Sequence, residues 1–212
     1  MNWKPPAAAT AASLLLPSVA ASAAVPPGGE LDFTVMRGGD EIGTHRLVFT
    51  RDGDELKVKI DTDVAVKMLG IAVYRFEHDG SEVWRDGHLV ALESKTNDDG
   101  TPHHLAVKED GGKLVVDGDG RRADEEIGVI PASLWNDDLV KQSTLLNTLD
   151  GSSMPVTITN RGTENVDVNG KTVAATHYSV TGKLNRELWY DDEGVLVQVK
   201  FDGSDGSDGS HD

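Results

Sequence analysis

Apolar and polar residues alternate along most of the chain, which is the two-residue period of a β-strand with one buried face. The clearest run covers residues 56–66. Its even-numbered positions are apolar or β-branched: Leu56, Val58, Ile60, Thr62, Val64 and Val66. Its odd-numbered positions are mostly charged: Lys57, Lys59, Asp61, Asp63 and Ala65. The pattern predicts a strand whose even-numbered side chains face a core.

Turn dipeptides divide the rest of the chain into segments of strand length. Residues 31–35 lead through Gly38-Gly39 to residues 44–49, and Asp52-Gly53 turns the chain into the run over residues 56–66. Asp-Gly or Asn-Gly between alternating runs is a strong hairpin signal. Such signals recur at Asp79-Gly80, Asp86-Gly87, Asp99-Gly100, Asp110-Gly111, Asp117-Gly118 and Asn169-Gly170, with Glu193-Gly194 later. Further strands are predicted at residues 71–78, 81–85, 88–97, 102–109, 113–117, 154–161, 163–168, 171–181, 185–190 and 195–201.

The strands and turns together predict an all-β fold that is mainly antiparallel. Short connections make consecutive strands antiparallel, and turn signals about 8 to 12 residues apart are typical of meanders, barrels and sandwiches. We expect a curved sheet or half-barrel of roughly ten to twelve strands. Its concave apolar face needs a cover, because a large apolar surface in water favours aggregation.

Residues 130–149 interrupt the alternation and are the candidate cover. Pro131 lies where the first turn of a helix would begin, and the residues that follow include Leu139, Val140, Leu145, Leu146 and Leu149. We predict one short helical segment near residues 131–149. Helical spacing fits only in part, so a strand over residues 140–149 is the alternative. Gly151 ends the segment in either case.

The two ends of the chain differ from the alternating region. Residues 1–24 carry one cation, Lys4, and then an Ala/Leu run that closes on small residues, which is typical of an export signal cleaved near Ala23 or Ala24. A disordered Ala/Pro-rich segment is the alternative. Residues 202–212 repeat Asp-Gly-Ser, so we expect a disordered acidic tail, with weak calcium binding as the alternative. A single β domain then spans residues 25–201.

Cysteine usage and charge narrow the location and the partners. The chain has no cysteine, so it lacks both disulfides and the residue that carries the lipid anchor of a bacterial lipoprotein. Eukaryotic secreted domains more often carry disulfides, so we expect a periplasmic location. No stretch after the export signal is long and apolar enough for a transmembrane segment. With 36 acidic and 20 basic side chains, the net charge of −16 disfavours nucleic acids and attraction to anionic membranes.

The sequence has no catalytic signature. A cysteine nucleophile, a Gly-x-Ser-x-Gly elbow, a glycine-rich phosphate loop and a His-Glu-x-x-His zinc helix are all absent. The histidines are scattered, and adjacent His103 and His104 would point to opposite faces of a strand, where they could not share one metal ion. We therefore expect no enzyme activity, no cofactor and no metal site.

Five aromatic residues are the candidate ligand-binding residues: Trp84, Trp135, Trp189, Tyr74 and Phe76. Trp135 belongs to the candidate cover and the others to predicted strands, so together they could line a cavity between cover and sheet. A concave apolar wall of this kind binds apolar ligands by desolvating them. The alternative is that these aromatic side chains only fill the core.

Three parts of the chain resemble an uncharacterised family of exported proteobacterial proteins that is named only as a domain of unknown function. They are GGDEIGTHRLVF at residues 38–49, EVWRDGHLVALESKTNDDG at residues 82–100, and LLNTLDG with ATHYSVTGKLNRELWYDDEGVLVQVKF at residues 145–151 and 175–201. The turns and the closing strands are more loosely similar to periplasmic half-barrel domains of the lipoprotein-carrier kind. This resemblance implies a half-barrel sheet, and it carries over no functional residue.

The sequence favours two functions of different classes, neither of them enzymatic. The first is a soluble periplasmic protein that binds a lipid or another hydrophobic small molecule on the concave face of its sheet. The second is a structural or interaction protein that presents a strand or a sheet face to an envelope protein.

Overall fold

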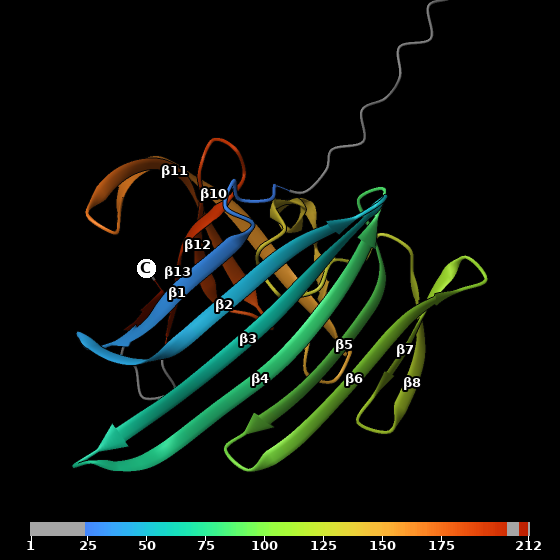
Figure 1. The fold of residues 1–212 in the computed structure, drawn as a ribbon, viewed down its shortest axis with the longest axis horizontal. Helices are drawn as coiled ribbons and strands as arrows, with labels where there is room; N and C mark the ends of the chain where they lie inside the picture. Colours follow the sequence, from blue (N-terminus) through green and yellow to red (C-terminus); the bar gives the residue numbers. More distant parts are fainter. Residues whose placement is uncertain (1–23, 203–207, 212) are drawn as a thin grey trace, which may run out of the picture.

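The computed structural model describes residues 24–202 and 208–211, so the predicted export signal lies outside the described residues apart from Ala24. The described chain forms one antiparallel sheet in the order β8-β7-β6-β5-β4-β3-β2-β1-β14-β13-β12-β11-β10-β9 (Figure 1). The strands are β1 Glu30–Arg37, β2 Asp40–Asp52, β3 Glu55–Met68, β4 Ile71–Arg85, β5 His88–Asp98, β6 Thr101–Asp110, β7 Lys113–Gly118, β8 Arg121–Glu126, β9 Thr144–Leu146, β10 Ser153–Val168, β11 Lys171–Gly182, β12 Arg186–Tyr190, β13 Leu196–Asp202 and β14 Asp208–His211. One 3₁₀ helix, η1 Asp137–Lys141, lies between β8 and β9.

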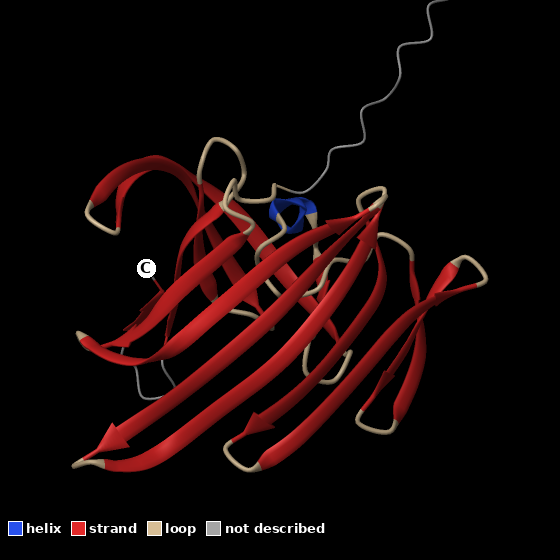
Figure 2. Cartoon of the chain, in the orientation of Figure 1, coloured by secondary structure: helices blue, strands red, loops and turns tan. Residues whose placement is uncertain are grey.

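The predicted all-β half-barrel is confirmed. Strands β1 to β8 form one meander and β9 to β13 a second, and the two meanders curve around a common interior. Figure 2 shows the helical turn η1 between the long strands of the first meander and the strands of the second. Residues 130–151, which we call the cover segment, therefore lie on the concave side of the sheet.

Strand β14 joins the two meanders. Its residues pair with β1, where Val35 lies opposite His211, and with β13, where Phe201 lies opposite Gly209. The repeat over residues 202–212 predicts a disordered tail, but Asp202 ends β13 and residues 208–211 form β14. A strand at this position needs only backbone donors and acceptors, which the facing edges of β1 and β13 provide. Residues 203–207 and 212 lie outside the described residues.

The core lies on the concave face, as the alternation in residues 56–66 predicts. Val58 and Ile60 are 1% and 3% exposed, whereas Lys57 and Lys59, which alternate with them, point to solvent. Ile60 pairs with Leu47 on β2, so the buried side chains of adjacent strands lie side by side. These residues belong to a cluster that extends to the leucines of the cover segment.

Two predicted turns prove to be wrong. Asp79-Gly80 lies inside the continuous strand β4, and Gly118 is the last residue of β7, so the β7–β8 turn falls two residues later. Gly80 has no positive φ, and a Cβ on Gly118 would lie 2.2 Å from the carbonyl oxygen of Asp150. Gly118 thus allows the backbone at Asp150 to approach the sheet closely. In the sequence alone, a glycine in this role looks like part of a turn.

The cover segment contains less helix than the sequence predicts. Only Asp137–Lys141 is helical, as the turn η1, and Thr144–Leu146 forms the short strand β9 against β10. Asn136 caps η1, because its side-chain oxygen accepts a hydrogen bond from the backbone N–H of Asp138. In the described part of the chain, no helix combines the length and the apolar character needed to cross a membrane.

We predict that Val58→Asp or Ile60→Asp unfolds the protein, whereas Lys59→Asp changes the free energy of unfolding by no more than about 0.5 kcal/mol. An unpaired carboxylate in the core costs several kcal/mol, and the Lys59 side chain is in solvent. Urea melts of the three variants measure the difference. Equal destabilisation by Ile60→Asp and Lys59→Asp would contradict the assignment of the two faces.

Candidate functional site

A cavity of about 410 Å³ lies between the concave face and the cover segment. Strands β1 to β4 form one wall, and β12 and β13 contribute to the other. Residues 132–134 and 147–149 of the cover segment line it from within the curve of the sheet. Its apolar lining includes Val35, Ile60, Val64, Phe76, Leu149 and Leu196.

A row of polar side chains crosses this apolar wall at one level of the sheet. The row consists of directly paired residues on five adjacent strands: His45, Thr62, His78, Thr96 and His103. The Nδ1 atom of His45 lies 2.7 Å from Oγ1 of Thr62, and Nδ1 of His78 lies 2.7 Å from Oγ1 of Thr96. We call these residues the histidine–threonine row. His45, Thr62 and His78 line the cavity.

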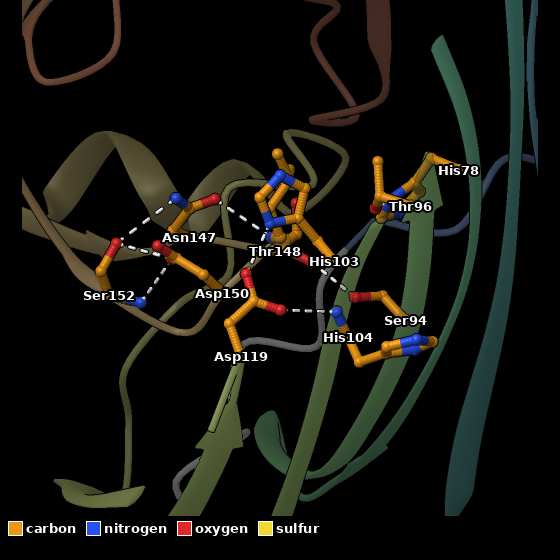
Figure 3. Close-up of polar contacts among 11 residues, drawn as sticks. His78, Ser94, Thr96, His103, His104, Asp119, Asn147, Thr148, Asp150 and Ser152 are labelled. Atoms are coloured by element: carbon orange, nitrogen blue, oxygen red, sulfur yellow. Dashed lines mark hydrogen bonds and ion pairs between the residues drawn. The ribbon is translucent and has the colours of Figure 1, made fainter. Parts of the chain in front are cut away.

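The buried part of the row is uncharged. Burial of His78 lowers the pKa of its imidazole, so the neutral ring is the favoured form at pH 7. His103, at the far end of the row, lies outside the cavity lining and has Nδ1 2.5 Å from Oδ2 of Asp119 (Figure 3). At His78 and at the two threonines the row therefore offers neutral donors and acceptors in a largely apolar wall.

A buried carboxylate fastens the cover segment to the sheet. Oε2 of Glu82 on β4 accepts hydrogen bonds from the indole N–H groups of Trp84 at 2.8 Å and Trp135 at 2.9 Å. Trp135 also makes edge-to-face contacts with Trp84 and Phe49, with ring centroids 5.4 and 5.2 Å apart. Glu82 is 1% exposed, and this burial raises the pKa of its carboxyl group although the indole donors act in the opposite direction.

A second contact holds the end of the cover segment against residues of the sheet whose side chains are small or absent. Ser94 Oγ donates a hydrogen bond of 2.6 Å to the carbonyl oxygen of Thr148 (Figure 3). The backbone of Asp150 lies against Gly118. Gly151 has φ +69°, and a Cβ there would lie 2.3 Å from Cγ1 of Val116. Small residues on the sheet thus let the backbone of the cover segment reach its surface.

One cation faces the cavity from the second meander. Arg186 on β12 belongs to the lining, and its guanidinium carbon lies 5.0 Å from the centre of the Phe201 ring. Its Nη1 atom also donates a hydrogen bond of 2.7 Å to the carbonyl oxygen of Asn185. Arg186 therefore gives this side of the cavity a positive charge.

The five aromatic residues predicted as ligand-binding residues separate into three places. Tyr74 and Phe76 line the cavity. Trp84 and Trp135 are buried in the contact that fastens the cover segment, outside the lining. Trp189 lies in a separate small cluster with Val166 and Ala175, and its ring stacks on His177 with centroids 4.3 Å apart. The structure therefore brings only Tyr74 and Phe76 together at the cavity.

Sequence reasoning missed the histidine–threonine row, Glu82 and Arg186. Thr62 follows Val58 and Ile60 on the core-facing side of its strand, so a polar residue at a core position was the available signal. Joining it to His45, His78 and Thr96 requires the register of four strands, which hydrophobic alternation leaves open.

The outer face of the sheet carries a larger but shallower depression of about 940 Å³. Its lining includes the charged residues Lys59, Asp79, Glu93, Lys95 and Asp117, which point away from the core. Its lining comes from strands β3 to β7 and the β7–β8 turn and includes no residue of the cover segment, so the covered cavity is the stronger candidate site. Among the residues with described positions, no three His, Cys, Asp or Glu side chains form a group suited to a metal ion.

Comparisons with known proteins agree with the fold and name no activity. The model of a domain of unknown function, DUF6134, matches residues 33–209. The crystal structure of a beta-barrel-like protein of the domain of unknown function DUF1849 from Brucella abortus is similar to 86% of this chain and 93% of that chain, with a TM-score of 0.60 and 12% identity. At that identity the likeness concerns the fold alone. No curated protein matches the chain significantly.

We predict that Glu82→Gln stabilises the protein relative to wild type increasingly as pH rises from about 4.3, the ordinary glutamate pKa. A raised pKa means that the folded protein holds this proton more tightly than the unfolded chain, so its stabilising effect is present at low pH and is lost as pH rises. Glutamine retains an acceptor for both indoles and has no charge to bury. The gain should grow with pH until the wild-type carboxyl group has lost its proton in the folded protein, and then stay constant.

Chemical denaturation of wild type and variant across this pH range measures the effect. Glu93→Gln is the matched control, because Glu93 is exposed on the neighbouring strand. A difference between Glu82→Gln and wild type that stays constant with pH would contradict a raised Glu82 pKa.

Proposed function

The chain belongs to the DUF6134 family of domains of unknown function, and we propose that it binds an amphipathic, lipid-like molecule in the covered cavity of its half-barrel. The observation that carries the proposal is a covered cavity whose largely apolar sheet wall is crossed by the histidine–threonine row, with Arg186 in the lining on the side of the second meander. We propose further that the protein is exported to the periplasm and acts as a binding protein, without catalysis.

The size and lining of the cavity support an apolar ligand. Its volume of about 410 Å³ falls in the range of about 300 to 1,000 Å³ that small-molecule sites occupy. Ile60, Val64 and Phe76 on one wall and Leu196 on the other would surround an apolar chain. Each square ångström of apolar surface removed from water contributes about 25 cal/mol.

The polar groups support a ligand with a polar end. His45, Thr62 and His78 present ring nitrogens and a hydroxyl to the cavity, and these groups already satisfy one another in pairs. A hydroxyl or ester group of a ligand can use their remaining capacity. Arg186 supplies the cation that a carboxylate or phosphate requires. The favoured ligand is therefore an acidic lipid or a long-chain acid.

The alternative, a protein that adds a strand to an envelope partner, has less support. The free edge strand β8 has the sequence RRADEE and carries five charged side chains. Charged side chains on an edge strand oppose pairing with another chain.

We predict that Val64→Trp weakens binding of a fluorescent long-chain fatty acid at least tenfold. Val64 lines the cavity, and the larger indole would occupy the space that an acyl chain needs. Asp63→Trp is the matched control, because Asp63 is the exposed neighbour on the opposite face of β3. Saturation binding measured by fluorescence, with melting curves for both variants, tests this. Absence of saturable binding to wild type, or equal affinity for wild type and Val64→Trp, would contradict the proposal.

We expect Arg186→Gln to weaken binding of the same fatty acid by about tenfold, a loss typical of one charge-assisted contact, while the corresponding alcohol binds with unchanged affinity. Glutamine keeps much of the side chain's length and removes its charge. Competition titrations with acid and alcohol separate the two effects. An equal loss for both ligands would mean that Arg186 shapes the wall and does not recognise an acidic end.

A further inference from the structure

We propose that the tip of the β3–β4 hairpin, residues 66–74, inserts into the surface of a lipid bilayer. The register pairs β3 with β2 only as far as Val64 and β4 with β5 only as far as Phe76. One more backbone hydrogen bond, from the N–H of Asp99 to the carbonyl oxygen of Arg75, follows on the β5 side. Over residues 66–74 the ladder joins β3 to β4, and Figure 1 shows the two strands extending past the neighbouring hairpins. The hairpin tip is thus a two-stranded projection from the half-barrel.

The projection ends in apolar side chains that face water. Leu69 is fully exposed, Met68 and Ile71 are 65% and 71% exposed, and Val73 and Tyr74 are exposed as well. Ile127 is the only other large hydrophobic residue that is comparably exposed among the residues whose burial is described, and it lies alone after β8. A contiguous exposed apolar group of this kind marks an interaction site.

The conformation of Leu69 in the turn indicates that this residue serves a purpose other than stabilising the fold. At five hairpin turns a residue with φ of +48° to +54° is followed by a glycine with positive φ. Four of these turns begin with Asp86, Asp99, Asp119 or Asn169, which tolerate this conformation, and the fifth begins with Leu69. Leucine is strained there and leaves its whole side chain in water, so the position is poor for stability and suited to inserting into an apolar phase.

The charge of the tip is compatible with the surface of a bilayer. Residues 66–74 contain one cation, Lys67, and no acidic residue, in a chain with 36 acidic side chains and a net charge of −16. Behind the tip, Arg75 makes an ion pair of 3.2 Å with Glu77, so Lys67 is the cation that would lie among the phosphates of lipid headgroups when the tip is buried. Tyr74, whose hydroxyl donates to Asp98 at 2.9 Å, has the amphipathic character typical of the interfacial region.

The apolar tip is continuous with the cavity. Met68 pairs with Ile71 at the end of the hairpin, Val66 pairs with Tyr74, and Val64 pairs with Phe76. Val64, Tyr74 and Phe76 also line the cavity. A bilayer around the tip would therefore lie next to the cavity mouth, which would give a lipid-like ligand an apolar route between them. This last step rests on the proposed function, whereas insertion of the tip does not.

Co-sedimentation of the protein purified from its host with protein-free vesicles of phosphatidylethanolamine and phosphatidylglycerol tests insertion. We expect Leu69→Asp to weaken vesicle binding roughly tenfold or more, because the variant lacks the favourable free energy of transferring the leucine side chain from water into the bilayer. The variant should fold normally, since Leu69 is exposed and aspartate tolerates its φ. Ile127→Asp is the matched control, because it adds the same charge at an exposed apolar residue outside the tip, and it should bind vesicles as wild type does.

A second variant reports insertion directly. The emission of Leu69→Trp should be quenched by brominated acyl chains in these vesicles, whereas Ile127→Trp should show no added quenching over wild type. Leu69→Asp should still bind the fluorescent fatty acid, which separates this proposal from the proposed function. Equal vesicle binding by wild type and Leu69→Asp would overturn insertion. Absence of binding to protein-free vesicles would overturn it too, and would assign the tip to a protein partner.

Discussion

The apolar concave face of the half-barrel has to be covered, and this constraint organises the rest of the structure. Strand β14 joins the two meanders in the sheet, and apolar side chains of both meanders face the common interior. The cover segment therefore enters the curve and is held by Trp135 on Glu82 and by Thr148 on Ser94. The first contact is buried and the second partly buried, and both are polar, which places the segment in one position, since an unpaired partner would be costly. Beside this segment, between it and the sheet, lies the cavity.

The interior is divided by the levels of the sheet. At the level of Glu82 the space is filled by aromatic and aliphatic side chains. At the next level Gly80, Ser94 and Gly118 leave room for backbone. The histidine–threonine row follows, and beyond it the apolar wall opens toward the tip of the β3–β4 hairpin. Successive levels thus hold packed core side chains, then the backbone of the cover segment, and then the cavity. Each difference follows from the residue that occupies the inward position of a strand at that level.

The local part of this arrangement could be predicted from the sequence, and the part that depends on pairing could not. Alternation over residues 56–66 gives the buried face of β3 correctly, and Asp86-Gly87 and Asp99-Gly100 mark real turns. Asp79-Gly80 misleads, because a glycine inside a strand looks like a turn when the strand around it is unknown. Strand β8 has no alternation of apolar and polar residues, so the sequence gives no local signal for a strand there. The turn at Leu69-Gly70 has no Asp or Asn before its glycine, so it lacks the usual hairpin signal. The cavity combines residues from distant strands and the cover segment, so only Tyr74 and Phe76 of the predicted set belong to it.

The central claim is that the covered cavity holds one amphipathic molecule. Native mass spectrometry of the protein after incubation with an extract of envelope lipids tests it most directly. The account predicts a folded species with the mass of the chain plus one lipid-sized ligand, and loss of that ligand when the chain unfolds. A folded protein that keeps the mass of the bare chain in the presence of every lipid class in the extract would contradict it.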